Sequence, residues 1–212
     1  MAHLSVDNVD LSFDKVPILI RATMAVDQGE VVAVLGPSGS GKSTLLRVIA
    51  GVVAPDAGAV TLSGHDITHV PTYQRGVGMV FQDNQLFPHL TVGENVAFGL
   101  KMAGMPSFVR RSTADDWLAR VGLSGFGLRD VSALSGGEAK RVALARTLAV
   151  EPSVVLLDEP LTGLDRELHD RLAHDVAALL ADLAITAILV THDPDEAATI
   201  AVRSLHMDDI NG

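Results

Sequence analysis

Residues 36–44 read Gly36-Pro37-Ser38-Gly39-Ser40-Gly41-Lys42-Ser43-Thr44. The apolar segment Val31–Leu35 precedes this stretch, and Leu45–Ala50 continues it with the spacing of a helix. Glycine adopts dihedral angles that other residues avoid, so its backbone N–H groups can approach a ligand closely. The amino end of a helix adds a partial positive charge. The stretch therefore predicts a strand, a loop and a helix that together hold phosphate groups.

The loop also fits the pattern G-x-x-x-x-G-K-[ST], which is typical of nucleoside triphosphate sites. We expect Lys42 to reach the β- and γ-phosphates of ATP and Ser43 to place its hydroxyl on Mg²⁺. The rest of the loop would supply backbone N–H groups. The alternative is a chance turn of glycine and serine before a helix. The apolar strand and the helix pattern on either side favour the ATP site.

A second motif, Val154-Val155-Leu156-Leu157-Asp158-Glu159-Pro160, runs from four apolar residues into two acids. Such a run is typical of a buried strand that ends at a ligand crevice. There Asp158 would hold Mg²⁺ through its water shell, and Glu159 would polarise the attacking water as a general base. Alone the motif is weak, because an acidic turn ended by Pro160 has the same residues. Beside the loop at 36–44 it indicates a functional site.

The third motif is Leu134-Ser135-Gly136-Gly137-Glu138, which has the S-x-x-E form of a helix cap. Two glycines in the first turn of a helix cost about 1 kcal/mol each relative to alanine, and a cap does not need them. Bare N–H groups and a serine hydroxyl at a helix amino end make a phosphate site. Because the loop at 36–44 already encloses one side of the nucleotide, this second surface suggests that ATP lies between two chains.

The composition excludes several classes of protein. The chain has 212 residues, a formal net charge of −10 and no cysteine, so disulfides, thiolate zinc sites and cysteine nucleophiles are absent. The acidic balance argues against a nucleic acid partner. Met1–Asp10 has no basic apolar run typical of a signal peptide. The richest apolar segment, Ala177–Val190, is interrupted by Asp182 and Thr186 and does not predict a membrane span.

Short β-branched or apolar segments predict strands at Leu4–Val9, Val31–Leu35, Gly58–Leu62, Val77–Phe81, Val154–Leu157 and Ile185–Val190. Periodic segments predict helices from Ser135 to Val150, at Arg166–Leu183 and at Asp195–Ala201. Continuous apolar strands that alternate with helices predict an α/β fold with a buried parallel sheet covered on both faces. The helical spacing of residues 84–150 indicates an insertion into that core.

Together these motifs resemble, in order and spacing, the ATPase subunit of ATP-binding cassette (ABC) transporters, over nearly the whole chain. The resemblance implies a P-loop NTPase (RecA-like) core with a mainly parallel sheet, an N-terminal antiparallel β subdomain and an inserted α-helical subdomain. It implies one domain, in which residues 1–84 and 151–212 form the core and residues 85–150 the helical subdomain. No C-terminal regulatory domain is expected.

The resemblance also implies roles for residues that are not distinctive alone. Phe13 stands where an aromatic ring stacks on adenine, although a core phenylalanine is the alternative. Gln82 is expected to meet Mg²⁺ and the attacking water, and His192 to contact the γ-phosphate, although a lone glutamine is usually a surface residue and a lone histidine usually structural. Asp165 is expected to contact the opposite P-loop, and Ser135–Glu138 to close over the ATP of a second chain.

Residues 82–96 resemble bacterial importer ATPases, in particular those serving thiamine, iron(III), polyamines, sulfate or molybdate. This segment would lie beside a groove for a helix of the membrane permease. Leu86, Phe87 and Pro88 would form part of that contact or pack internally, and the sequence does not decide between the two.

Two mild departures from the family pattern are Glu138-Ala139, where glutamine is more usual, and Thr162-Gly163, where Ser-Ala is commoner.

The resulting hypothesis is a homodimer, or a dimer with a related ATPase, on the cytoplasmic face of the membrane. ATP closes the dimer and drives permease subunits, which an extracytoplasmic solute-binding protein supplies with solute; hydrolysis reopens it. Rival interpretations are a DNA-repair or chromosome ATPase, an exporter ATPase and a non-hydrolysing nucleotide-gated module. The absence of cysteine and of sustained heptads argues against the first, and Glu159 and His192 argue against the last. The sequence does not identify the transported solute.

Overall fold

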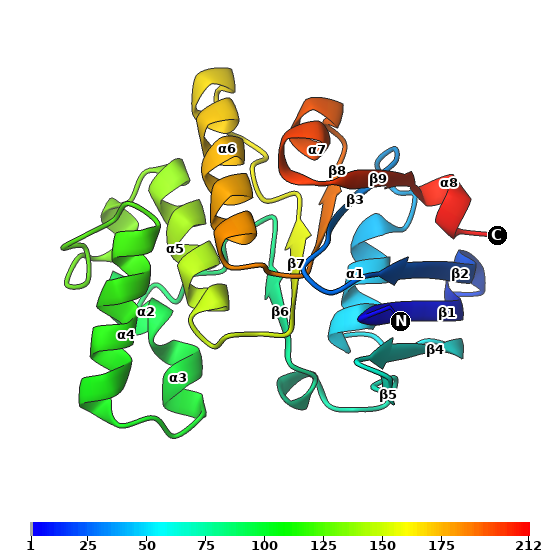
Figure 1. Cartoon of the computed structure of the whole chain (residues 1–212), viewed down its shortest axis with the longest axis horizontal. Helices are drawn as coiled ribbons and strands as arrows, with labels where there is room; N and C mark the ends of the chain where they lie inside the picture. The colour runs from blue at the N-terminus through cyan, green and yellow to red at the C-terminus, as the bar shows by residue number, and fades with distance from the viewer. Residues whose placement is uncertain (1) are drawn as a thin grey trace. The chain divides into compact units, whose positions relative to one another are not determined.

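The computed structural model describes residues 2–212 and divides them between two units (Figure 1). The first unit comprises the residues up to Met79, Ser153–Glu159 and Val176–Gly212. The second comprises Val80–Pro152 and Pro160–Asp175.

A five-stranded sheet has the strand order β6-β7-β8-β3-β9. Its strands are β3 (Val31–Leu35), β6 (Val77–Val80), β7 (Val154–Asp158), β8 (Ala187–Thr191) and β9 (Arg203–His206). Strand β3 pairs in parallel with β8 and β9, and β7 pairs in parallel with β8. Every residue of β7 and β8 is buried, as their apolar sequences predict. Parallel pairing brings the carboxyl ends of β3, β7 and β8 to the same edge of the sheet.

A second, antiparallel sheet of the first unit has the order β2-β1-β4-β5. Its strands are β1 (Leu4–Phe13), β2 (Val16–Val26), β4 (Ala57–Leu62) and β5 (His65–Asp66). Helix α1 (Lys42–Ala50) lies between the two sheets (Figure 1). Its buried apolar side chains join those of both sheets in one core. The helix that begins at the glycine-rich loop is therefore held by packing along its whole length.

The first unit also contains the last part of α6 (Arg166–Asp182), two further helices and a short helical turn. Helix α7 (Pro194–Ile200) follows β8, and α8 (Met207–Ile210) follows β9. The turn η1 spans Thr72–Gln74. Buried Arg75 after it donates to the carbonyls of Val48 and Ile49 at the carboxyl end of α1.

The second unit is helical, as the spacing of residues 84–150 predicts. It contains α2 (Val92–Val96), α3 (Phe98–Met102), α4 (Ser107–Arg120), the turn η2 (Val131–Ala133), α5 (Gly136–Leu148) and the first part of α6 (Arg166–Asp182). Ser135 and Glu138 form the predicted capping box of α5, and Thr91 and Glu94 form another on α2. In residues 2–212, no helix combines the length and the apolar composition needed to cross a membrane.

The structure corrects several predicted boundaries. Strand β1 runs to Phe13 instead of Val9, and the long strand β2 was not predicted. Irregularities in the β1–β2 register interrupt the alternation of side chains, and Asn8 and Arg21 have φ of 48° and 45°. The strand predicted from Ile185 begins at Ala187, because the Ile185 N–H donates to Leu180 O and still closes the end of α6.

The ion pair between Glu30 and Arg203 ties the start of β3 to β9. Arg203 Nε lies 2.7 Å from Glu30 Oε1, and this hydrogen bond lowers the pKa of Glu30 below its ordinary value. Replacing Glu30 by Gln should lower the free energy of unfolding by about 0.5–1 kcal/mol at neutral pH, because the pair is partly exposed. The melting temperature should fall by roughly 1–4 °C.

A depressed carboxylate pKa stabilises the fold above the unfolded pKa, and this contribution is lost as the pH falls through the folded pKa. The difference between the wild type and Glu30→Gln should therefore shrink below about pH 4 in thermal melts. A difference that grows in acid would contradict this account of the pair.

Candidate nucleotide-binding site

The loop between β3 and α1 has a backbone shape that favours glycine at two positions. Gly39 and Gly41 have φ of 83° and 97°, in the left-handed region. A side chain on Gly41 would also lie 3.1 Å from Ile18 O, and one on Gly36 would lie 2.9 Å from Ser40 Oγ. The loop is therefore closely packed against its surroundings, and its backbone is the surface that a ligand can meet.

Lys42 places its ammonium group on this loop. The residue is 4% exposed, and Nζ donates to the carbonyls of Gly36 at 2.6 Å and Pro37 at 2.8 Å. Buried Ser40 Oγ has no hydrogen-bond partner within the described residues. A cation on the loop and a buried hydroxyl without an acceptor or donor fit a loop that binds a polar ligand.

Two oxygen-bearing side chains that could bind a hard cation lie next to the loop. Ser43 Oγ, in the first turn of α1, donates to Asp158 Oδ1 at 2.7 Å. Asp158 ends β7 and is 5% exposed, and this burial raises its pKa, although the Ser43 bond and the charge of Arg47 oppose the rise. A hydroxyl and a carboxylate fit Mg²⁺, which keeps several waters and takes other ligands from phosphate. The described residues contain no group of three or more His, Cys, Asp or Glu side chains that could hold a metal without such help.

Glu159 and His192 meet at the same edge of the sheet. His192 Nδ1 lies 3.3 Å from Glu159 Oε2, and the Glu159 N–H donates to Val190 O of β8 at 2.9 Å. Glu159 has φ of 45°, an uncommon backbone conformation for a non-glycine residue that functional sites retain. The imidazole is 57% exposed, and the carboxylate is mostly buried. The pair therefore offers a proton acceptor next to a group that can donate a hydrogen bond.

The segment after β9 supports the loop, and sequence analysis did not identify it. The Cβ of buried Met207 would lie 3.1 Å from a side-chain carbon on Gly36. Asn211 Oδ1 accepts the N–H of Ile20 at 2.6 Å, and its amide donates to the Ile18 carbonyl at 3.2 Å. Because Ile18 also packs against Gly41, this segment braces the loop at both of its ends. No local sequence pattern predicts these contacts, because they join residues that are far apart in the sequence.

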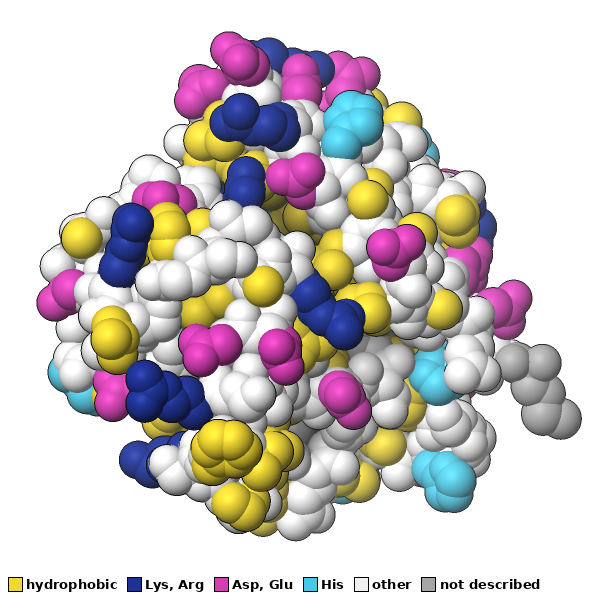
Figure 2. Space-filling model, turned by 60° about the vertical axis from the view of Figure 1, so that its left-hand side comes forward, with side chains coloured by type: hydrophobic (Ala, Val, Ile, Leu, Met, Phe, Trp, Pro, Cys, Tyr) yellow, Lys and Arg dark blue, Asp and Glu magenta, His cyan; other side chains and the backbone are white. Residues whose placement is uncertain are grey.

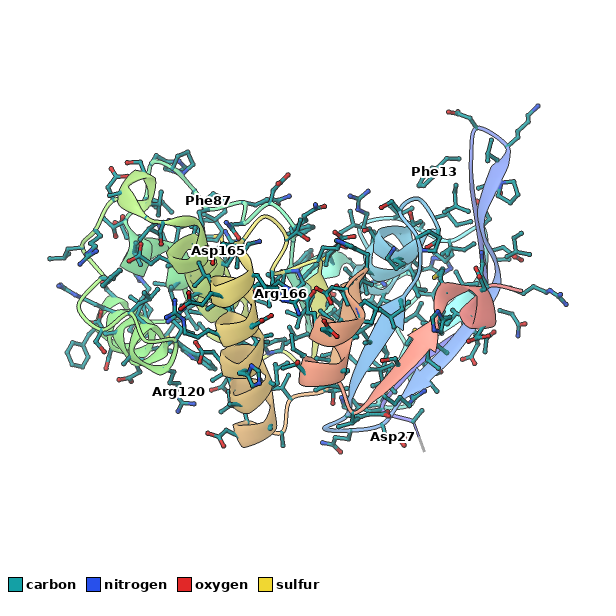
Figure 3. All side chains as sticks on the ribbon, turned by 90° about the horizontal axis from the view of Figure 1, so that it is seen from above. Phe13, Asp27, Phe87, Arg120, Asp165 and Arg166 are labelled. Carbon is teal, nitrogen blue, oxygen red and sulfur yellow. The ribbon has the colours of Figure 1, made fainter. Side chains whose placement is uncertain are left out.

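Phe13 is at the end of β1, in the β1–β2 hairpin. Its side chain is 46% exposed and projects from the hairpin (Figure 3). It is therefore not a core phenylalanine, and its face is available to a flat ligand.

The other predicted site residues lie in the second unit. Gln82 is exposed after β6, and Ser135 caps α5 by accepting the Glu138 N–H. Gly136 has room for a side chain, whereas one on Gly137 would lie 3.1 Å from Leu168 Cδ2. Close packing against Leu168 on α6 therefore gives Gly137 a structural role in addition to the predicted one.

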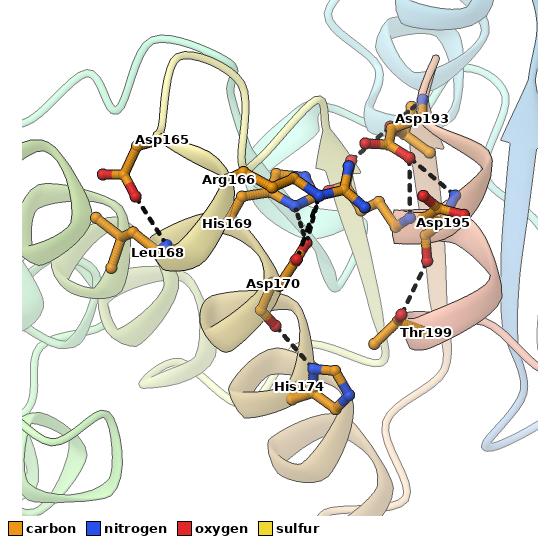
Figure 4. A network of polar contacts seen from close by, with 11 residues as sticks. Asp165, Arg166, Leu168, His169, Asp170, His174, Asp193, Asp195 and Thr199 are labelled. Carbon is orange, nitrogen blue, oxygen red and sulfur yellow. Dashed lines mark hydrogen bonds and ion pairs between the residues drawn. The ribbon is translucent and has the colours of Figure 1, made fainter.

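Asp165 stands at the amino end of α6. Its carboxylate accepts the Leu168 N–H at 3.0 Å, as Figure 4 shows, and its carbonyl accepts the His169 N–H. The residue is therefore a helix cap within its own chain. Arg166 and Asp170, one turn apart on α6, form an ion pair beside it.

Leu86, Phe87 and Pro88 are not equivalent. Phe87 packs inside the second unit, with its ring centroid 4.4 Å from that of Phe98, and its N–H donates to Asn95 Oδ1 at 2.8 Å. Pro88 is exposed and Leu86 is half-buried. Of the two interpretations of this segment, internal packing holds for Phe87.

The second unit contains a pocket of about 430 Å³, and the first of its lining residues, Thr91, follows Pro88 closely in the sequence. Charged side chains of both signs and several small residues line it. Its lining is Thr91, Gly93, Glu94, Ala97, Ser107, Arg110, Arg111, Ala114, Asp115, Gly125, Gly127 and Leu128. Phe108 and Leu128 are large hydrophobic residues that remain more than four-fifths exposed, at 85% and 81%. Figure 2 shows hydrophobic side chains gathered at the lower edge of one face, with basic and acidic side chains around them.

Comparison with known proteins agrees with this geometry. The chain is 47% identical over 206 residues to an Fe(3+) ions import ATP-binding protein of Streptomyces coelicolor, covering 97% of this chain and 59% of that protein. It is 50% identical over 185 residues to a sulfate/thiosulfate import ATP-binding protein of Mycobacterium tuberculosis, covering 87% and 53%. It is 43% identical over 200 residues to a putrescine transport ATP-binding protein of Escherichia coli, covering 94% and 53%. The chain thus spans little more than half the length of these relatives.

A solved structure also matches. It is the dimeric post-hydrolysis state of an ATP-binding cassette bound to ADP and Pi, with a TM-score of 0.84 and 30% sequence identity, covering 96% of this chain and 93% of that one. This match confirms the predicted α/β P-loop NTPase fold with parallel and antiparallel sheets. The import ATP-binding relatives confirm the predicted resemblance to importer ATPases. The sequence profile of the ABC transporter family matches residues 19–162, and the chain belongs to that family.

Proposed function

We propose that this chain binds ATP with Mg²⁺ and hydrolyses it, as the nucleotide-binding subunit of a bacterial import transporter. The observation that carries the proposal is the meeting of three groups at one edge of the parallel sheet. These groups are Lys42 on its loop, the Ser43–Asp158 pair and the Glu159–His192 pair. The names of the import relatives support the direction of transport.

Binding would use the loop at 36–44. Lys42 Nζ exchanges the carbonyls of Gly36 and Pro37 for phosphate oxygens, and the N–H groups of the loop and of the first turn of α1 hold the rest of the phosphate chain. Ser43 and Asp158 hold Mg²⁺, which supplies charge neutralisation at the phosphates. Phe13 stacks on adenine.

Hydrolysis would use the pair at the ends of β7 and β8. Glu159 accepts a proton from the water that attacks the γ-phosphorus. His192, whose Nδ1 lies 3.3 Å from Glu159 Oε2, would donate a hydrogen bond to the γ-phosphate. Gln82 would contribute to the same water and metal. The phosphorus–oxygen bond to the β-phosphate breaks, and ADP and phosphate leave.

The working form would be a dimer with a second copy or a related ATPase. Ser135–Glu138 of one chain would close over the γ-phosphate held by the other, with Asp165 at the same interface. The matching solved ATP-binding cassette is dimeric, which supports this assembly. The presence of two compact units supports a core of residues 1–84 and 151–212 with a helical subdomain at 85–150. The units differ from these bounds because the helical unit also includes residues 80–84, 151–152 and Pro160–Asp175.

The permease subunits would contact the pocket of the second unit from the membrane side, at the cytoplasmic face, and a solute-binding protein would act outside. A short helix with charged and apolar side chains suits a pocket that has Arg110 and Arg111 together with Glu94 and Asp115. The exposed apolar side chains of Phe108 and Leu128 extend this surface.

Glu159→Gln tests the hydrolysis step. The variant should bind Mg·ATP as well as the wild type but lose about 10²- to 10⁴-fold in turnover, because a general base is removed while the shape is kept. Phosphate release and equilibrium ATP binding measure the two effects. Glu151→Gln, an exposed change outside the site, should leave both unchanged. Turnover of Glu159→Gln at the wild-type rate would remove Glu159 from this role.

Asp158→Asn tests the metal site. Burial disfavours the charged carboxylate at neutral pH, so the neutral amide, which still accepts from Ser43, should raise the melting temperature of the protein without ligand. The same variant should lose the extra thermal stabilisation that Mg²⁺ adds to ATP. A variant that keeps its full response to Mg²⁺ would show that the metal binds elsewhere.

Arg111→Glu tests the permease contact. The reversed charge should lower the fraction of the protein that sediments with the membranes of the source cells, while ATP hydrolysis by the soluble protein stays unchanged. Arg171→Glu makes the same change on an exposed residue that does not line the pocket, and should sediment like the wild type. Equal sedimentation of all three proteins would remove the pocket from the proposed contact.

A further inference from the structure

Glu196 is a buried acid that the mechanism above does not use. It lies on α7, four residues after His192, and is 4% exposed. Burying a carboxylate is costly, and packing alone would be served better by an apolar side chain. Such a residue is expected only where its hydrogen bonds hold something in place.

The carboxylate bonds to the strand that carries His192. Thr191, the last residue of β8, donates its hydroxyl proton to Glu196 Oε2 at 2.5 Å. Because the hydroxyl has one proton, this donation leaves its lone pairs to accept, and Thr191 Oγ1 accepts the Asp193 N–H at 3.0 Å.

These hydrogen bonds hold the residues before and after His192, which are Thr191 and Asp193. Thr191 is joined to Glu196 and to the Asp193 backbone, and Asp193 Oδ1 accepts the N–H groups of Asp195 and Glu196. The side chain of His192 itself is mostly exposed, so packing does not fix it. Its place next to Glu159 therefore depends on the backbone of the turn at residues 191–193.

We propose that Glu196 is a positioning residue for ATP hydrolysis, which holds the turn at 191–193 so that His192 meets Glu159. The proposal rests on the function proposed above. It does not require Glu196 to touch ATP, and it assigns the residue an effect on turnover and not on nucleotide affinity.

The test compares Glu196→Ala with Glu196→Gln. The alanine variant should lose about ten- to hundredfold in kcat, as displaced reacting groups do, with the Kd for Mg·ATP unchanged. Glutamine keeps an oxygen that accepts from Thr191 and should recover most of the lost kcat. Thr199→Ala, which removes an exposed hydrogen bond from the same helix, should behave as the wild type. A wild-type kcat in Glu196→Ala, or a weaker Kd that accounts for the whole loss, would overturn the proposal.

Two variants of Thr191 cover the case in which Glu196→Ala does not fold. Thr191→Ser keeps the hydroxyl and should keep kcat, whereas Thr191→Val removes it and should lower kcat with Kd unchanged. Equal kcat values for the two would overturn the proposal. In a His192→Ala background, Glu196→Gln and Thr191→Val should cause no further loss, because the residue they position is gone. If the wild type itself does not hydrolyse ATP, the proposed function fails; if it does and the Thr191 pair is indistinguishable, only this inference fails.

Discussion

Parallel pairing of three buried strands is the constraint on which the site depends. β3, β7 and β8 lie side by side with their carboxyl ends at one edge, and their apolar residues leave no freedom to slide or turn over. Lys42 is more than a hundred residues before Asp158 and His192 in the sequence, yet all three lie at or shortly after the carboxyl end of one of these strands. The register of the sheet therefore fixes the geometry of the site before any side chain forms a bond.

Charged groups are buried at this edge in a way that stability alone would not favour. Lys42, Asp158 and Glu196 are each at most 5% exposed. Lys42 is held by carbonyl oxygens, Asp158 by a serine hydroxyl and Glu196 by a threonine hydroxyl, so each has a hydrogen bond to a neutral group. Burying such groups costs stability, and their place at this edge fits a site for a phosphate chain and a metal ion.

Sequence analysis located the parts of the site that follow from local patterns. The glycine loop, the acids after Leu157 and the cap at Ser135 each occupy one short stretch, and the structure places them at the predicted strand or helix ends. What it missed depends on contacts between distant residues. Strand β2 was missed because irregularities in its register break the alternation of side chains, Gly137 packs closely on Leu168 of another helix, and Asn211 acts through Ile18 and Ile20. Glu196 reads as an ordinary helical residue until its burial is known.

The contacts around the glycine loop explain how it can bind a ligand with little rearrangement. Gly41 packs on Ile18, Gly36 packs on Met207, and Asn211 ties the strand of Ile18 to the segment of Met207. These contacts do not involve Lys42 Nζ, whose bonds to Gly36 O and Pro37 O have the length of ordinary hydrogen bonds. Exchange of those two carbonyls for phosphate oxygens therefore moves one flexible side chain and leaves the loop backbone where it is. A loop braced from outside keeps its N–H groups aimed at one place, and donors that need no reorganisation are the ones that stabilise developing charge best.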